Sequence, residues 1–174
     1  GYWVHSALSG QGVATAAVAS PWVASSTTQA ANASPARVPT ATTAANIHDP
    51  NTVRRIVAEH GGADGLLHLV GGWRGGTPID EADPADWDFL ESGLIRSLQN
   101  VSQPLFPALL ASEDARVAVI SSVSVAKPTA KNAMYASAKA AAEAWTLALA
   151  EGFAGTGAAA TVLRVMALLT PQMR

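Results

Sequence analysis

Apolar residues along the chain follow two alternating patterns, helical repeats and short continuous runs. After Asp49, which is typical of a helix start, apolar side chains recur at Val53, Ile56 and Val57, the spacing of one helix face. The run from Leu66 to Val70 is short, mostly apolar and closed by glycines. That pattern indicates a strand buried on both faces.

The alternation continues to the end of the chain. A second helix is predicted from about Asp83, with one apolar face made by Trp87, Leu90, Leu94 and Leu98. A strand, an alanine-rich helix and a last strand are predicted at Val117 to Ile120, about Asn132 to Gly152, and Ala160 to Val165. Strands that alternate with helices in this way need right-handed crossovers. The sequence therefore predicts an α/β fold, a doubly wound parallel sheet with helices on both faces, as a single domain over residues 1–174.

The first fifty residues have a different composition. They contain two charged residues, Arg37 and Asp49, while the other 22 lie in 51–174. A short strand is predicted from Tyr2 to Val4, and residues 25–45, rich in Ser, Thr and Ala, predict a poorly defined loop-rich region. The chain starts without methionine and stops just after its last predicted strand, so we expect a fold that is truncated at its C-terminal end.

The composition narrows the class of function. The hydrophobic fraction of 49% is enough for one globular core, and a net charge of −2 with no basic run gives no footprint for nucleic acid. The absence of cysteine excludes disulfides and thiolate zinc sites and is compatible with a cytoplasmic location. No apolar run approaches the ~18 residues that span a bilayer, and the four histidines lack metal-ligand spacing. Neither a membrane nor a metal is expected.

Tyr135 and Lys139 are the first candidates for chemistry. Their four-residue spacing places them on one face of the predicted alanine-rich helix, one turn apart. A phenol has an ordinary pKa of ~10, and a neighbouring ammonium lowers that pKa toward the range useful for proton transfer. The motif is too short to carry the assignment by itself.

Ser122 adds a second element to this pattern. It lies thirteen residues before Tyr135, directly after a predicted buried strand. Ligands of doubly wound sheets bind beyond the carboxyl ends of the strands, so a hydroxyl there is placed to bond a substrate carbonyl oxygen. The alternative is a strand-end serine that bonds only the backbone.

The order and spacing of Ser122, Tyr135 and Lys139 resemble the active site of the short-chain dehydrogenase/reductase family. The resemblance implies a Rossmann-like fold and an NAD(P)-dependent oxidoreductase that moves hydride between nicotinamide and a carbonyl or imine carbon. It also implies roles: Tyr135 as general acid and base, Ser122 polarising the substrate, and Lys139 binding the ribose hydroxyls. The family's fourth catalytic residue is an asparagine that holds a water for a proton relay, and Leu94 occupies the matching position.

The resemblance also implies residues that bind the cofactor. The family's phosphate-binding turn, which opens a helix, matches residues 5–12, where Gly10 and Gly12 are kept and Ser6 replaces the first glycine. Asn46 and Ile47 match the segment beside the adenine ring. Thr170 matches a threonine that contacts the carboxamide. A second strand is predicted from Trp22 to Ala24, and Ser25 and Ser26 after it carry no charge, so the choice between NAD and NADP stays open.

The stretch from Val70 to Gly76 is similar to one branch of the family, the dihydropteridine reductases. In that branch Val70, Gly71 and Gly72 would pass close to the nicotinamide ribose. Trp73 would stack on a flat substrate such as a pterin, or else pack as a loop aromatic against the sheet edge.

Two hypotheses for the whole function follow. The first is an oxidoreductase acting on a small carbonyl, imine or pterin-like substrate, assembled as a homodimer or homotetramer through its second and third predicted helices, as in the family. The second is a non-catalytic Rossmann-fold protein that binds a nucleotide or regulates, which Leu94 and Ser6 favour.

Overall fold

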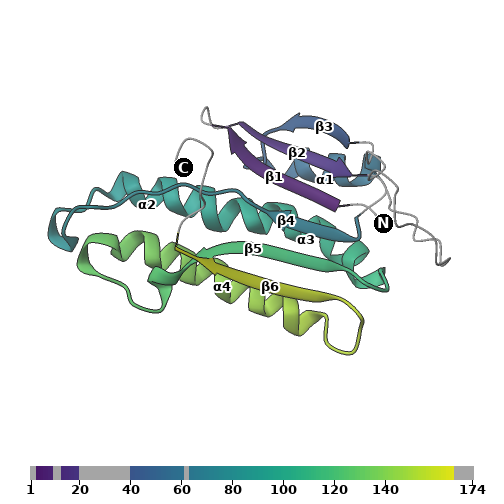
Figure 1. Ribbon diagram of the computed structural model, residues 1–174. Coiled ribbons are helices and arrows are strands. Elements are labelled where there is room, and N and C mark those ends of the chain that lie inside the picture. Colours follow the sequence, from purple (N-terminus) through teal and green to yellow (C-terminus); the bar gives the residue numbers. More distant parts are fainter. Residues whose placement is uncertain (1–2, 10–12, 20–39, 61–62, 167–174) are drawn as a thin grey trace, which may run out of the picture.

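The computed structural model describes residues 3–9, 13–19, 40–60 and 63–166. These residues form one sheet of six strands in the order β3-β2-β1-β4-β5-β6 (Figure 1). The strands are β1 (Trp3–Ser9), β2 (Val13–Ala19), β3 (Thr40–Ala45), β4 (Gly65–His68), β5 (Arg116–Ser122) and β6 (Ala159–Val165). This order is that of a Rossmann-like sheet.

Four of these strands run as the sequence predicts. β1, β4, β5 and β6 pair in parallel, with β1 next to β4 and β5 between β4 and β6. β1 is longer than the expected strand from Tyr2 to Val4 and reaches Ser9. The α/β fold class with a parallel core is confirmed.

The strand β2 departs from the prediction. It is antiparallel to both β1 and β3, where the sequence led us to expect a helix opening after Gly12. Only three residues separate β1 from β2, too few for the crossover that parallel neighbours need. β-Branched Val13, Thr15 and Val18 also favour a strand. β3 in turn lies inside the segment expected to be loop, at residues 40–45.

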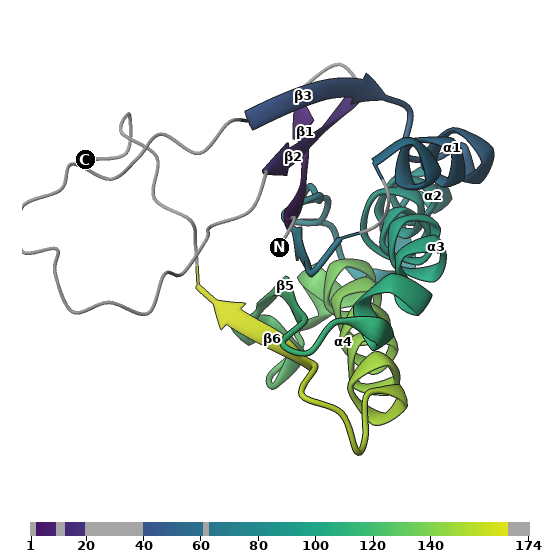
Figure 2. The ribbon, with the colours of Figure 1, turned by 90° about the vertical axis from the view of Figure 1, so that its right-hand side faces the viewer.

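In the described part of the chain four α-helices make the second layer, and all of them lie on one face of the sheet (Figure 2). They are α1 (Pro50–His60), α2 (Pro84–Leu90), α3 (Ser97–Ala111) and α4 (Ala133–Gly152). A π-helical segment, η2 (Glu91–Arg96), joins α2 to α3, and three short 3₁₀ turns complete the structure: η1 (Ile79–Glu81), η3 (Val123–Val125) and η4 (Ala130–Asn132). The expected helices on both faces are therefore not found among the described residues, since β2 replaces the helix that would follow β1.

The helix starts that the sequence predicts are present. Asp49 accepts hydrogen bonds from Asn51 N (3.0 Å) and Thr52 Oγ1 (2.7 Å) at the start of α1. Asp83 accepts one from Ala85 N (2.9 Å) at the start of α2, followed by Pro84. Carboxylates satisfy the free N–H groups at these ends.

The core lies between the helices and the parallel strands. Its most buried members come from every layer: Ile47, Leu66, Leu98, Leu105, Leu109, Val117 and Phe153. On β5, Val117 and Val119 are buried toward the helices, whereas Ala118 and Ile120 are half-buried on the other face. No helix in the described ranges has both the length and the apolarity to cross a membrane.

Candidate active site

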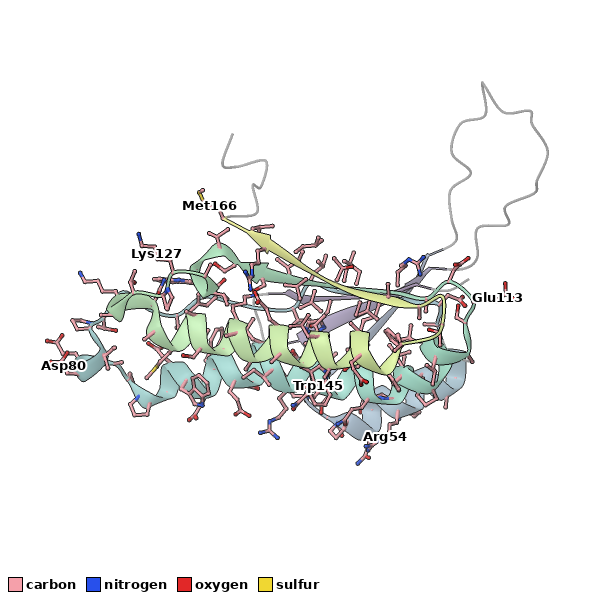
Figure 3. All side chains as sticks on the ribbon, turned by 90° about the horizontal axis from the view of Figure 1, so that it is seen from below. Arg54, Asp80, Glu113, Lys127, Trp145 and Met166 are labelled. Atoms are coloured by element: carbon pink, nitrogen blue, oxygen red, sulfur yellow. The ribbon has the colours of Figure 1, made fainter. Side chains whose placement is uncertain are left out.

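A cavity of about 330 Å³ opens beyond the carboxyl ends of β4, β5 and β6. Its walls come from four segments: Val70, Gly71, Gly72 and Trp73 after β4, Ile120 and Ser121 on β5, Tyr135 and Lys139 on α4, and Val165 and Met166 at the end of β6. Figure 3 shows Met166 at the same end of the sheet as Lys127, with Glu113 at the opposite end. The cavity is at the edge where the sequence places the candidate residues.

Lys139 is buried at this edge, with 6% of its surface exposed. Its ammonium donates a hydrogen bond to the carbonyl oxygen of Ile120 (2.8 Å) and lies 5.9 Å from the centre of the Tyr135 ring. Burial lowers the pKa of Lys139 to about 8, and the Glu143 carboxylate opposes that shift. The amine therefore titrates much closer to neutrality than an exposed lysine does.

Tyr135 is half-buried beside it, one turn earlier on α4. Burial raises the pKa of its phenol, and a hydrogen bond from the Ser122 hydroxyl works in the opposite direction. The sequence led us to expect a lowered pKa, and for this structure that expectation is wrong. The reason is that desolvation outweighs an ammonium that bonds Ile120 O instead of the phenol.

Ser122 bonds the backbone, one of the two alternatives that the sequence left open, and also lies beside Tyr135. It ends β5 and caps η3, where its Oγ accepts hydrogen bonds from Ser124 N (3.2 Å) and Ser124 Oγ (2.9 Å). With both bonds accepted, its own proton remains to be donated, and Tyr135 lies within hydrogen-bonding reach. The hydroxyl of Ser122 is thus both a structural cap and a neighbour of the phenol.

Two glycines after β4 are packed too closely to carry side chains. A Cβ added to Gly71 would stand 2.8 Å from Leu94 Cδ2 and 3.8 Å from Lys139 Nζ. A Cβ on Gly72 would stand 2.7 Å from the Phe89 ring. Leu94 is itself 3% exposed, so the residue that replaces the family's asparagine fills the space beside Gly71.

Trp73 continues this loop into the cavity wall. The backbone behind its ring is Gly75 and Gly76, both with positive φ (155° and 105°), and Gly76 N donates to Lys131 O (2.8 Å). A Cβ on Gly75 would stand 2.9 Å from that same oxygen and 3.4 Å from the indole. The ring is 57% exposed, backed by glycine on one side and bordering the cavity.

The structure does not bring all the predicted cofactor residues to the cavity. Ile47 is buried in the core, and its carbonyl oxygen accepts from Asn100 Nδ2 (2.9 Å). Asn46 is exposed, and its Oδ1 accepts from His48 N (3.0 Å). The backbone of Ser6 is level with His68 across the β1–β4 pair. Gly10, Gly12 and Thr170 lie outside the described residues.

The structure also adds residues that the sequence analysis missed. His68 is buried on β4, 3.3 Å from Ser97 Oγ, and burial lowers its pKa to about 3. Glu143 is buried on α4 and bonds Ser121 and Arg164. The four-residue spacing from Lys139 to Glu143 was a usable signal for the second group, whereas His68 carried none.

Comparison with known protein families gives a match over almost the whole chain. The profile of the short chain dehydrogenase family matches residues 6–173. No curated protein sequence matches the chain significantly.

Among solved structures, ElxO with NADP bound is similar at a TM-score of 0.67 and 18% identity, over 74% of this chain and 54% of ElxO. Serine dehydrogenase from Escherichia coli is similar at a TM-score of 0.64 and 19% identity, over 69% of this chain and 57% of that protein. Sorbitol-6-phosphate 2-dehydrogenase SrlD from Erwinia amylovora is similar at a TM-score of 0.64 and 24% identity, over 73% of this chain and 52% of that protein. The chain thus spans about half the length of the structures that it matches. With the family profile covering nearly every residue, the chain belongs to the short chain dehydrogenase family.

Proposed function

We propose that residues 1–174 form a single domain of a cytoplasmic NAD(P)-dependent oxidoreductase that moves hydride between nicotinamide and a small carbonyl or imine compound. The observation that carries the proposal is that Tyr135 and Lys139 line one cavity beyond the parallel strands, with the Ser122 hydroxyl hydrogen-bonded to Tyr135. A phenol with a hydroxyl bonded to it and an ammonium nearby make a set that can bind a carbonyl oxygen and move a proton to it.

The residues around the cavity fit the nicotinamide half of a dinucleotide. Gly71 and Gly72 offer backbone without side chains, and Lys139 offers a buried cation for ribose hydroxyls. When bound, the dinucleotide supplies or takes up the hydride. Gly10, Gly12, Ser6, Asn46, Ile47 and Thr170 stay predictions for the rest of the cofactor.

The protein's own part in the reaction is proton transfer and orientation. In the direction of reduction, Tyr135 gives its phenolic proton to the substrate oxygen or nitrogen and becomes a phenolate. Ser122 donates a hydrogen bond to the same substrate atom. The Lys139 ammonium stabilises the phenolate by its positive charge. The reverse reaction uses the same groups in the opposite order.

The experiment that tests this role is Tyr135→Phe. The variant keeps the ring and its packing but loses the proton, so turnover should fall by about 10²–10⁴, the usual contribution of a general acid. Binding of nucleotide, followed by quenching of the five tryptophans, should be retained. Ser137→Ala, an exposed position on the same helix, is the matched control. Turnover unchanged in Tyr135→Phe would exclude the proposed acid.

The same fluorescence signal decides between the cofactors. ElxO was solved with NADP bound, which supports dinucleotide binding by this fold. Titration of the protein with NADH and with NADPH gives the preferred one directly. The absence of quenching by either, with no turnover of any carbonyl, would favour the alternative of a regulatory protein, for which Leu94 in place of the asparagine is the supporting observation.

The cavity wall supports a planar compound as the substrate. Trp73 presents an exposed indole beside Tyr135 and Lys139, and a ring held on a glycine backbone is suited to stacking with a flat molecule such as a pterin. Trp73→Ala should raise KM for a planar imine or carbonyl more than for a small aliphatic ketone. Equal changes in KM for both would exclude stacking.

The outer helical face supports a homodimer or homotetramer. Leu147 is 64% exposed on α4, and a hollow of about 270 Å³ is lined by Phe106 of α3 and by Trp145 and Ala148 of α4. Figure 3 shows Trp145 on the helical layer, where its indole donates to Ser102 Oγ of α3 (2.9 Å). Leu147→Arg should shift the mass measured by light scattering to that of a monomer. An unchanged mass would exclude this face as the interface.

A further inference from the structure

The helix α4 carries a second buried ionic group next to the proposed catalytic lysine. Tyr135, Lys139 and Glu143 follow one another at intervals of four residues, so they form one stripe along the helix. Glu143 is 6% exposed, and hydrogen bonds from Arg164 lower the pKa of its carboxyl. It is therefore a buried carboxylate, which a fold tolerates only when hydrogen bonds compensate for the lost water.

Those hydrogen bonds come from the ends of two strands. Ser121 Oγ on β5 donates to Glu143 Oε1 (2.5 Å). Arg164 on β6 donates through Nε to Oε1 (2.9 Å) and through Nη2 to Oε2 (2.6 Å), a two-point ion pair. The carboxylate thus joins α4 to β5 and β6 at the edge that holds the cavity.

The contacts of Lys139 and Glu143 fall on consecutive residues of β5. Lys139 Nζ bonds the carbonyl oxygen of Ile120, and Glu143 bonds the side chain of Ser121. Two successive turns of the helix are therefore fixed to two successive residues of the strand. A shift of α4 along β5 would break both contacts together.

We propose that Glu143 is a positioning residue for Lys139, holding its amine at the cavity as an ammonium, and that Arg164 sets the strength of this effect. The consequence for catalysis rests on the function proposed above, whereas the effect of Glu143 on the charge of Lys139 is independent of that function.

The charges around Lys139 determine whether substitution of a neighbouring residue raises or lowers the pKa of Lys139. Tyr135 and Glu143 face it from α4, His68 from β4, and Arg164 acts from β6 through its ion pair with Glu143. His68 is neutral above its pKa of about 3, and Tyr135 is neutral because burial raises its pKa. Glu143 is thus the anion of this group, and it opposes the lowering of the Lys139 pKa by burial.

Two substitutions should therefore move Lys139 in opposite directions. Glu143→Gln keeps the shape and one accepting oxygen, loses one of the two hydrogen bonds from Arg164, and removes the negative charge, so the pKa of Lys139 should fall further, by about one unit. Arg164→Gln removes the positive charge that offsets Glu143, so the pKa of Lys139 should rise. A merely structural loss would not produce shifts of opposite sign.

The measurement is NMR of protein labelled with ¹³C at the lysine ε-carbon. The chain has three lysines, and Lys127 and Lys131 are exposed, so they serve as internal controls. The Lys139 signal is assigned by its loss in Lys139→Met. Opposite shifts of its titration midpoint in the two variants, with the controls unmoved, support the proposal. No shift, or shifts of the same sign, overturn it.

A second arm covers folding and function. If Glu143→Gln does not fold, Arg164→Gln carries the test alone, because its guanidinium is about half exposed. A midpoint that falls or stays fixed in that variant then overturns the proposal. In kinetics, Glu143→Gln should lose turnover first at alkaline pH and recover it as pH is lowered, and Glu143→Asp should restore the wild-type profile. If the NMR shifts occur but neither wild type nor variant turns over, the proposed function fails and the electrostatic role stands.

Discussion

At the scale of single residues, Ser124 decides which way the Ser122 hydroxyl points. It gives Ser122 Oγ two hydrogen bonds, one from its backbone N and one from its own hydroxyl. An oxygen that accepts both is left with its proton to donate, in the direction of Tyr135. The orientation of the Ser122 hydroxyl thus depends on Ser124, which is not itself one of the proposed catalytic residues.

Ser124→Ala tests this dependence. The variant removes the side-chain hydrogen bond and keeps the backbone one, so kcat/KM should fall by about tenfold, the equivalent of one hydrogen bond of ~1.4 kcal/mol. Ser122→Ala should cost more, since it removes the donor itself. Steady-state kinetics on both variants gives the comparison. A Ser124→Ala enzyme with wild-type kcat/KM would show that Ser122 needs no such support.

The sequence was informative about these residues where chemistry depends on local spacing. Tyr135 and Lys139 are one helical turn apart, so their place at one cavity could be predicted from the α/β pattern, and Ser122 lies beside Tyr135 at the end of β5. His68 and Arg164 could not be placed at the site, because they come from distant segments that only packing brings together, whereas Leu94 was matched to a site position through the family resemblance alone. The raised pKa of Tyr135 was missed for the same reason: burial is not visible in a spacing.

At the scale of elements, the junction between the β4 loop and η2 is fixed by one close contact. Gly71 faces the buried end of Leu94, and a methyl group there would stand 2.8 Å from Leu94 Cδ2. Gly71→Ala should therefore lower the free energy of unfolding by about 1–3 kcal/mol, the usual cost of an overpacked core.

The clash has a specific partner, so it should be relieved specifically. In a Leu94→Ala background the same Gly71→Ala substitution should cost about 1 kcal/mol less, because the methyl group then fills part of the vacated space. Urea unfolding of the four proteins in this cycle measures the coupling. Strictly additive effects would mean that the backbone, and not Leu94, excludes the methyl group.

The elements themselves were predictable to different degrees. α1 and α2 begin where Asp49-Pro50 and Asp83-Pro84 indicate, because the capping carboxylates lie next to the helices they start, and α4 begins one residue after Asn132, where its apolar pattern indicates. β2 was mistaken for the start of a helix, because glycines at positions 10 and 12 match a phosphate-binding turn as well as a hairpin. The strand differs from a helix start in its hydrogen-bonded pairing with β1 and β3, and the local sequence of β2 carries no information about those partners.

At the scale of the whole molecule, the parallel strands and the helical layer enclose His68 almost completely. It is 2% exposed, and burial lowers its pKa to about 3, against an ordinary value of about 6.5. In the unfolded chain His68 therefore binds a proton between these two values, and in the folded chain it does not. By linkage, stability is fully present above pH 6.5 and is lost as pH falls toward 3.

His68→Asn removes this titration and keeps a polar side chain beside Ser97. Between pH 6 and pH 5 the wild type should lose about 1 kcal/mol of unfolding free energy more than the variant does, close to the limit of ~1.4 kcal/mol per pH unit for one proton. The lowered pKa values of Asp49 and Glu143 also favour the fold, but their contribution is lost only below the ordinary carboxyl pKa of ~4. The window above pH 5 therefore isolates the histidine. Urea unfolding at pH 7, 6 and 5 gives the dependence of the unfolding free energy on pH for the wild type and for His68→Asn. The same dependence in both proteins would mean that His68 accepts its proton without leaving the core.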